Sequence, residues 1–560
     1  PEGQLAVSGT RTEFSGPVLA IAALSDESST AAFARHAAAI PRGTKFDWTY
    51  EPGAGRVETT WQVRTSNGQP VLQGWIPHHY RKTVHNLNLN GIEFTTRRGR
   101  MKLAAGIEFR IAWAFSGITP AFPLPRDDRF DASRLGALIE AWAEELLAKP
   151  EAQRHAADTY WGGKSMLKTA QAFTMAKQLE LPVADRLLEE AKRVATDWLT
   201  YRDGEEAYYY ARYPAPWNGI VGFNPSYGSD QFTDNHFHYG YLVMTAALIG
   251  MHDREWLDRY SDGLREVVRQ YAQWERDSVD FPRLRTFECW AGHSYAAGMS
   301  NGFDGNNQES SSEATGSWAG VFLLGAVLDD QEMLATGAMG FAIETEAIHE
   351  YWNNVYGWND PESSNWSPDY EPTICSVVRD RDVGAWTWFS GEPIHIYGIQ
   401  WLPAWTHSHY FGAHHEHAAY QLDQMMIRQG KDEGRLEWSD LDDDWGQVTT
   451  GYAAFCVPEE VCDALDEAFE NKWPIASPRF AGTPYYLAHA CRAYGFVDAD
   501  AYTDLPTSLV MKTSDGRRTA IVYNAGNVDR TIAIYVYGRK VKAETIPANS
   551  VRAIPLETRE

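Results

Sequence analysis

The chain has 560 residues, enough for two or three domains with a sizeable core, and its formal net charge is −25. This balance argues against a nucleic-acid partner, which needs a basic face, and no apolar run is long enough to predict a transmembrane helix. The 22 Trp and 28 Tyr are typical of proteins that stack sugar rings, but also of large aromatic cores.

The first 106 residues predict a domain of short strands. Gly, Pro, Asn and Asp bound three β-prone runs, at 17–24, 57–63 and 71–76. Residues 28–40 favour a helix. Because the chain enters this region abruptly, we expect residues 1–106 to form a β-sandwich domain that lacks its first strands. His78 and His79 follow a predicted strand, so we expect them to point to opposite faces and to be structural.

A connector at 107–130 precedes a change to helical periodicity. Residues 132–147 are strongly amphipathic. Further helical windows follow at 161–180, 184–201, 235–250, 253–275, 309–327, 329–350, 411–428, 452–470 and 482–494. Paired helices joined by long aromatic loops favour an α-helical toroid at 151–500, because ordinary bundles have shorter loops. We expect the loops at one end of this scaffold to build the site, and the acidic run 442–444 to be a solvated loop.

Beyond residue 501 the pattern returns to short strands. Four β-prone runs, with Gly-containing turns between them, lie at 509–511, 519–523, 531–537 and 550–555. A sheet this small predicts that residues 501–560 pack on another domain, with the N-terminal sandwich as the candidate. The five cysteines show no metal-ligand pattern, and Cys456 with Cys462 is the one candidate disulfide.

Three acids at predicted helix starts carry the candidate chemistry. Asp234 precedes a run of histidines and tyrosines, and Glu309 and Glu313 flank three serines. If Glu309 opens a helix, both glutamates project from one face about one turn apart, and their repulsion raises the pKa of at least one. Acids in aromatic surroundings with few cations are typical of enzymes that cleave glycosidic bonds. The structural alternatives are an N-cap for Asp234 and a solvated helix face for the pair.

Two other functional classes stay open at this point. His236 and His238 could bind zinc together with the histidines of 414–417, although the usual spacing to a third ligand is missing. The chain could also be a non-catalytic glucan-binding protein in which the acids only bond to hydroxyl groups.

Several separate motifs resemble the endo-β-1,3-glucanases of glycoside hydrolase family 81. The matching segments are Asp158-Thr-Tyr-Trp-Gly-Gly-Lys164, Asp234-Asn-His-Phe-His-Tyr-Gly-Tyr241, Ala291-Gly-His-Ser-Tyr295, Asn307-Gln-Glu-Ser-Ser-Ser-Glu-Ala314 and His395-Ile-Tyr-Gly-Ile-Gln-Trp-Leu-Pro403. They span much of residues 150–410, and the match is weaker in both β regions. One departure is Asn235, where the family more often has His.

The resemblance implies a multidomain α+β chain. Its parts would be the β-sandwich at 1–106, a small α/β linker domain at 107–150, an (α/α)6 toroid at 151–500 and the C-terminal strands at 501–560. It further implies a secreted, monomeric endo-1,3-β-glucanase that cleaves β-1,3-glucan with inversion and needs no metal or cofactor. By residue, Asp234 matches the general acid, Glu309 and Glu313 match the two glutamates that supply the base, and His238 matches a histidine near the acid.

General chemistry agrees with these roles. An inverting hydrolase holds its two carboxyl groups about 6.5–9.5 Å apart, which leaves room for a water molecule. Asp234 must keep its proton, so we expect burial or a nearby carboxylate to raise its pKa. Of the glutamates, we favour Glu309 as the base, with Glu313 positioning the water or tuning its partner. The candidate substrate contacts are Tyr160, Lys164, Trp217, Asn218, His236, Tyr239, Tyr241, His293, Asn306, Gln308, His395 and Gln400.

Overall fold

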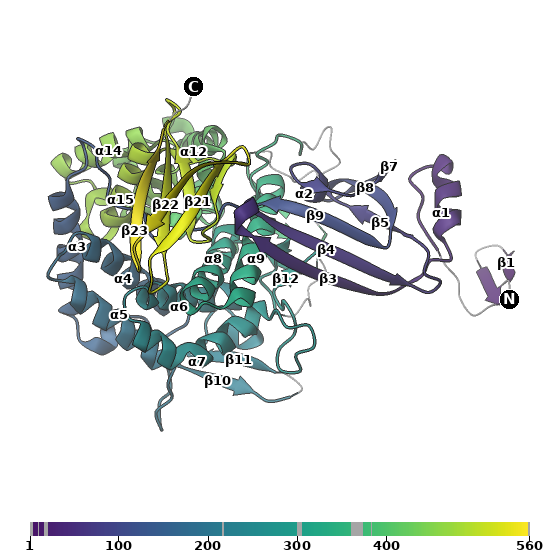
Figure 1. The fold of residues 1–560 in the computed structure, drawn as a ribbon, viewed down its shortest axis with the longest axis horizontal. Helices are drawn as coiled ribbons and strands as arrows, with labels where there is room; N and C mark the ends of the chain where they lie inside the picture. Colours follow the sequence, from purple (N-terminus) through teal and green to yellow (C-terminus); the bar gives the residue numbers. More distant parts are fainter. Residues whose placement is uncertain are drawn as a thin grey trace.

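The computed structural model describes residues 4–8, 11–15, 21–215, 218–298, 305–359, 373–381 and 383–557. Along the sequence, a region of strands comes first, a large helical region follows, and a second region of strands comes last (Figure 1). Trp217, one of the predicted substrate contacts, lies outside the described residues. In the described part of the chain, no helix has the length and apolar character needed to cross a bilayer.

Two antiparallel sheets form most of the N-terminal region, on the right of Figure 1. One has the order β3-β4-β9-β6 and the other β5-β8-β7. Trp61 and Trp75, one from each sheet, meet edge to face with ring centroids 5.3 Å apart. The strands are β3 (Pro41–Glu51), β4 (Arg56–Thr65), β5 (Val71–Trp75), β6 (Val84–His85), β7 (Leu89–Thr96), β8 (Gly99–Gly106) and β9 (Glu108–Ala114). Because β9 pairs along β4, the first sheet continues past the predicted boundary at residue 106.

Two smaller elements precede these sheets. A hairpin of β1 (Gln4–Ser8) and β2 (Arg11–Ser15) comes first, and helix α1 (Thr30–His36) follows. Helix α1 lies within the predicted helical window of 28–40. Residues 21–24, the described end of the predicted strand at 17–24, are not a strand, and residues 16–20 lie outside the described part.

The prediction that His78 and His79 point to opposite faces is wrong. They lie in a single helical turn, α2 (Pro77–Tyr80), and their ring centroids are 3.9 Å apart. Pro77 explains the difference, because its fixed φ favours the first position of a helix over continuation of the strand. Both side chains are buried, and His78 Nδ1 is 2.7 Å from the hydroxyl of Tyr351 at the end of helix α9 (Gln331–Tyr351). The pair therefore helps to join the N-terminal sheets to the helical region.

The helical region is built around α6 (Asn235–Gly250) and α8 (Ser311–Leu328), whose residues are nearly all buried. Gly240 permits their close approach, since a Cβ atom at that position would lie 2.8 Å from Cβ of Ser317. The other helices of this region, besides α9, are α3 (Ala132–Leu147), α4 (Trp161–Gln178), α5 (Ala184–Trp198), α7 (Arg254–Ala272), α10 (Pro393–Gly398), α11 (His409–Gly412), α12 (His415–Gly430), α13 (Asp443–Ala453), α14 (Pro458–Asn471) and α15 (Pro478–Tyr494). Every predicted helical window contains a helix.

Two windows, 411–428 and 452–470, each contain parts of two helices. The predicted helix at 452–470 divides at Pro458, which begins α14, while α13 ends at Ala453. Asp442 and Asp444 are exposed, as a solvated segment predicts, but the prediction of a loop at 442–444 is wrong, because Asp442 is the N-cap of α13. Its side chain accepts a hydrogen bond from the backbone N–H of Trp445 at 2.9 Å. An acid at this position stabilises a helix start, so a run of acids is compatible with a cap as well as with a loop.

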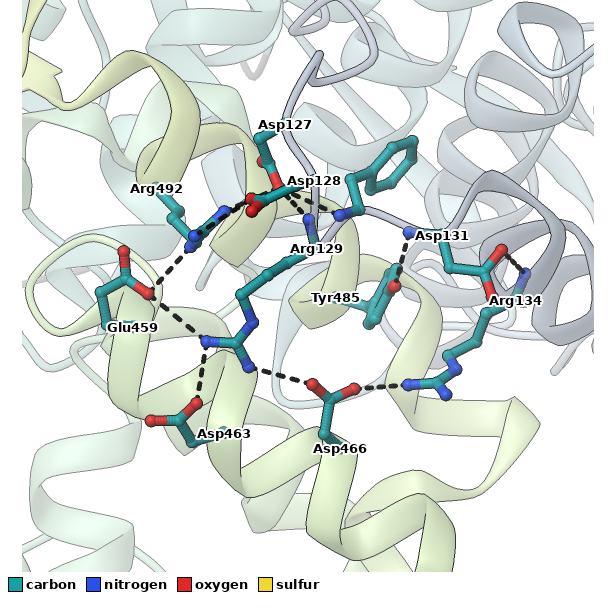
Figure 2. Close-up of polar contacts among 11 residues, drawn as sticks. Asp127, Asp128, Arg129, Asp131, Arg134, Glu459, Asp463, Asp466, Tyr485 and Arg492 are labelled. Atoms are coloured by element: carbon teal, nitrogen blue, oxygen red, sulfur yellow. Dashed lines mark hydrogen bonds and ion pairs between the residues drawn. The ribbon is translucent and has the colours of Figure 1, made fainter.

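The first helix of this region packs against the last, and an ion-pair network covers their junction (Figure 2). Arg129, in the segment that leads into α3, and Arg134, in the first turn of α3, both bind Asp466 of α14. Arg492 of α15 extends the network back to the same segment. The remaining pairs join Arg129 to Asp463 and Glu459, and Arg492 to Asp127, Asp128 and Glu459.

The C-terminal strands form two further antiparallel sheets, of order β17-β19-β20-β23 and β18-β21-β22, drawn in yellow in Figure 1. They are β17 (Phe496–Val497), β18 (Ala501–Thr503), β19 (Ser508–Lys512), β20 (Arg518–Asn524), β21 (Arg530–Val536), β22 (Arg539–Ile546) and β23 (Ser550–Leu556). Strand β18 packs against the tip of the β3–β4 hairpin, and Phe496 stacks on His415 of α12. These strands therefore contact both other regions. All five cysteines are free thiols, so the candidate bond between Cys456 and Cys462 is not formed.

Candidate active site

Asp234 occupies the N-cap position of α6 but does not act as a cap. Its backbone is left-handed, with φ of 56°, and its side chain makes no capping hydrogen bond. Aspartate tolerates this conformation better than most residues do. Burial raises the pKa of the Asp234 carboxyl well above its usual range, and the negative charges of Glu313 and Glu309 raise it further. The structure thus places the three predicted acids within electrostatic reach of one another.

A single backbone segment ties the loop of Asp234 to the loop of Glu309. The N–H of Asp234 donates to the carbonyl oxygen of Ala296 at 2.7 Å, and the N–H of Ala296 donates to the carbonyl oxygen of Asn307 at 2.6 Å. Ala296 lies two residues beyond β13 (His293–Ser294), and Asn307 begins β14 (Asn307–Gln308). The two acid-bearing loops are therefore held in register by hydrogen bonds that no side chain supplies.

The two glutamates have different surroundings. Helix α8 begins at Ser311, so Glu309 lies before the helix and does not share a helical face with Glu313, contrary to the expectation. Glu313 is buried, and its Oε1 accepts a hydrogen bond from the Tyr241 hydroxyl and lies 3.3 Å from Lys164 Nζ. Glu309 is half-buried and accepts the backbone N–H of Trp388 at 2.9 Å. Burial raises the pKa of Glu309 to about 7; the Trp388 N–H lowers this pKa, and the charge of Glu313 raises it.

Gln400, a predicted substrate contact, fixes the backbone around Glu309. Its Nε2 donates to the carbonyl oxygen of Glu309 at 2.7 Å and to that of Ser376 at 3.1 Å. Its Oε1 accepts a hydrogen bond from the Ser311 hydroxyl at 2.6 Å. Gln400 is fully buried, so we infer that it orients the glutamate loop.

Tyr160 and Lys164 lie one helical turn apart at the start of α4. Lys164 Nζ donates to the Tyr160 hydroxyl at 2.6 Å and lies 4.2 Å from the centre of the Tyr160 ring. Burial lowers the pKa of Lys164, whereas the neighbouring Glu313 raises it. The ring of Tyr160 also lies 5.1 Å from that of His238, so the lysine, the tyrosine and this histidine form one cluster.

Both histidines of α6 are buried and uncharged. His238 Nδ1 is 2.7 Å from the Thr159 hydroxyl, and His236 Nε2 is 3.4 Å from Nε2 of Gln308. Burial lowers the pKa of each imidazole to about 3. Across the described ranges, no cluster of three or more His, Cys, Asp or Glu side chains could hold a metal ion. The zinc alternative therefore has no assembled set of ligands there.

The chain resembles known proteins both in sequence and in fold. A sequence model described as the glycosyl hydrolase family 81 C-terminal domain matches residues 129–474, which is more than half of the chain. The chain belongs to glycoside hydrolase family 81.

Relatives of this family 81 chain include two bacterial proteins named glucan endo-1,3-beta-D-glucosidase. The one from Thermobifida fusca is 31% identical over 504 residues, which cover 88% of this chain and 62% of the relative. The one from Acetivibrio thermocellus is 30% identical over 492 residues, which cover 86% of this chain and 60% of the relative. The chain thus spans about three fifths of the length of these curated relatives. A mutant glycoside hydrolase family 81 structure from Clostridium thermocellum superposes with a TM-score of 0.83 at 26% identity, covering 95% of this chain and 71% of that chain.

Five other predicted substrate contacts of this family 81 chain form polar contacts within the protein. Tyr239 is fully buried, and its hydroxyl donates to the carbonyl oxygen of Ile220 at 3.1 Å. The ring of His293 contacts Arg98 of the N-terminal region and is also fully buried. The last three predicted contacts also bind within the protein. Asn218 Nδ2 donates to Val279 O (2.6 Å), Asn306 Nδ2 donates to Ala297 O (2.9 Å), and His395 Nδ1 lies 2.6 Å from the Ser390 hydroxyl.

Sequence reasoning missed a group of exposed aromatic residues beside the acids. Trp161 is 54% exposed and donates its Nε1 to the hydroxyl of Tyr227, which is 57% exposed, at 3.0 Å. Both rings contact Tyr160. Trp388, which is 59% exposed, borders Glu309 through its backbone. Trp161 lies in the motif at 158–164, so the sequence could have indicated it as a substrate contact. Trp388 is separated from Glu309 by 79 positions, and no local pattern connects the two.

Proposed function

We propose that the chain hydrolyses internal β-1,3-glucosidic bonds with inversion at the anomeric carbon. Asp234 is the general acid, Glu309 is the general base and Glu313 sets the charge of the site. The observation that carries the proposal is the contrast among the three carboxyl groups. One is held protonated by burial and neighbouring charge, one is half-buried with a pKa raised to about 7, and one is bound to a lysine.

The reaction follows from that contrast. Asp234 gives its proton to the glucosidic oxygen as the bond to the anomeric carbon breaks. Glu309 removes a proton from a water molecule that attacks the same carbon from the opposite face of the sugar ring. For this geometry we expect about 6.5–9.5 Å between the two carboxyl groups. Solvent exchange then returns the proton to Asp234 and removes one from Glu309, which restores the starting state.

Glu313 changes the pKa values of Asp234 and Glu309 and takes no part in the proton transfers. Its negative charge, bound by Lys164 and Tyr241, raises the pKa of Asp234 and of Glu309. We place the neutral His238 beside the acid, where it supports Tyr160 and Lys164. The exposed rings of Trp161, Tyr227 and Trp388 are the surfaces on which glucosyl units would stack.

The scaffold proposed for this chemistry is an (α/α)6 toroid behind an N-terminal β-sandwich. Helix packing supports six pairs, namely α4–α5, α6–α7, α8–α9, α10–α12, α13–α14 and α15–α3, and the contact between α3 and α4 would close the ring. Contacts of Trp61 with Trp75, and of Trp75 with Phe109, support the sandwich, since they join its two sheets. The names of the relatives support β-1,3-glucan as substrate, on which we propose a secreted monomer acts.

A product time course on linear β-1,3-glucan, followed by proton NMR, tests this function. We expect oligosaccharides of several lengths from the earliest time points, with new reducing ends that appear first as the α-anomer. Initial β-anomer would contradict inversion, and glucose as the sole early product would contradict endo action. If no reducing ends formed from any β-1,3-glucan, the binding-protein alternative would hold. Loss of activity after exhaustive chelation, regained with zinc, would favour the zinc alternative.

A further inference from the structure

A small cavity, lined in part by Glu313, lies inside the helical region. It offers about 10 Å³ in which the centre of a water molecule can move. Most of its lining is apolar, but Glu313, Ser317 and His407 contribute polar side chains. A cavity of this size holds one water molecule when two to four polar partners surround it.

His407 is the least satisfied of these polar groups. It is 2% exposed, and neither of its ring nitrogens has a hydrogen-bond partner among the described residues. Burial lowers its pKa to about 4, so near neutral pH the ring carries one N–H donor and one acceptor nitrogen. Leaving such a group unbonded inside a protein is costly, which favours a bound partner.

Gly316 brings this ring close to the glutamate. His407 belongs to a short 3-10 turn at Thr406–Ser408, and Gly316 lies three residues after Glu313 on α8. A Cβ atom at Gly316 would lie 3.3 Å from His407 Nε2, so any side chain there would take up space beside the ring. Glycine at this position therefore leaves space between the His407 ring and the helix that carries Glu313, and all three residues line the cavity.

Glu313 has bonding capacity left on this side. Tyr241 and Lys164 both bind its Oε1, and the second oxygen of an ionised carboxylate is also a hydrogen-bond acceptor. The hydroxyl of Ser317 donates to the carbonyl oxygen of Ala314 at 2.7 Å and can still accept a hydrogen bond. A water molecule in the cavity would thus have a carboxylate, a hydroxyl and an imidazole nitrogen within its lining.

We propose that one buried water molecule joins His407 to the carboxylate of Glu313, and that His407 is a positioning residue for that glutamate. The water and His407 hold Glu313 from behind, as Lys164 and Tyr241 hold it on the side of Tyr160. The catalytic consequence rests on the proposed function, but the water site itself does not.

The first test is diffraction at a resolution that shows ordered water. We expect a density peak in the cavity within about 3.2 Å of a His407 ring nitrogen and of a Glu313 carboxylate oxygen. A cavity without such a peak would overturn the proposal, whether or not the protein hydrolyses glucan. This outcome is therefore separate from failure of the proposed function.

The second test compares variants kinetically. We expect His407→Leu and Gly316→Ala each to lower kcat about tenfold with KM nearly unchanged, because Glu313 loses a partner on which the reacting acids depend. His407→Gln, which keeps a polar atom, should retain most of kcat. The matched control is His409→Leu, which removes another buried histidine two residues away that packs on Phe341. Equal kcat in the His407→Leu and His409→Leu variants would overturn the positioning role.

Discussion

Lys164 Nζ lies 3.3 Å from Oε1 of Glu313, and we infer that this ion pair gives the two glutamates different roles. The carboxylate of Glu309 accepts the backbone N–H of Trp388, and its pKa is raised to about 7. A carboxylate bound by a lysine and a tyrosine is poorly placed to receive a proton from water. We therefore propose the half-buried Glu309 as the base and Glu313 as the source of the fixed charge.

Replacing Asp234 should remove activity without destabilising the fold. We expect Asp234→Asn to lower kcat by about 10²- to 10⁴-fold, since the leaving oxygen loses its proton donor. A carboxyl whose pKa is raised in the folded state costs stability as the pH rises above its unfolded value. The Tm of the variant should therefore equal that of the wild type near pH 4 and exceed it near pH 8. Wild-type kcat in this variant would remove Asp234 from the mechanism.

The pair of Lys164 and Glu313 should behave as a unit. Lys164→Met leaves Glu313 buried without its cation, so we expect a lower kcat and a free energy of unfolding reduced by about 3 kcal/mol. The double variant with Glu313→Gln should recover much of that stability, as measured by denaturant unfolding. Lys177→Met, in the exposed last turn of the same helix, is the control and should change neither quantity. Additive losses in the double variant would argue against the coupling.

The pH profile should report the charge of Glu313. A base with a pKa of about 7 makes kcat/KM rise with pH through that value, and loss of the Asp234 proton makes it fall at higher pH. The negative charge of Glu313 raises both pKa values, so Glu313→Gln should move both limbs of the profile to lower pH. Limbs that stay in place, or move to higher pH, would show that Glu313 does not tune its neighbours.

The ion-pair network of Figure 2 should contribute to stability through Asp466, which binds two arginines. Its members are partly exposed, so we expect Asp466→Asn to cost only about 1 kcal/mol, or about 1 °C in Tm for a chain of this size. Asp185→Asn, which removes an 85% exposed partner of Lys177, should leave Tm unchanged. Calorimetry can separate the two variants. Equal Tm values would mean that the network does not hold α3 against α14 and α15.

Local patterns in the sequence predicted the elements better than the contacts between them. The apolar period of each helical window is a local property of the sequence, and Asp234, Glu309 and Glu313 lie in short motifs at predicted helix starts. The start of α8 was misplaced by two residues, because Glu309 is held by Gln400 and the backbone of Trp388 and does not join the helix.

The connections that assemble the site could not be predicted in this way. Ala296 joins two loops through backbone atoms, which any residue other than proline could supply, so its identity carries no signal. His78 and His79 lie with Pro77 in a helical turn, although the residues before them have the pattern of a strand. Tyr239 and His293 carry the residue types of a binding site, yet their partners lie within the fold.

Azide rescue of the base variants tests the central assignment most directly. Azide needs no general base, so Glu309→Gln should lose activity in buffer and regain it with added azide. NMR should then show an α-glycosyl azide, because azide attacks from the side that water normally takes. We expect no such product from Glu313→Gln under the same conditions. An α-glycosyl azide from Glu313→Gln alone, with none from Glu309→Gln, would contradict the account and assign the base to Glu313.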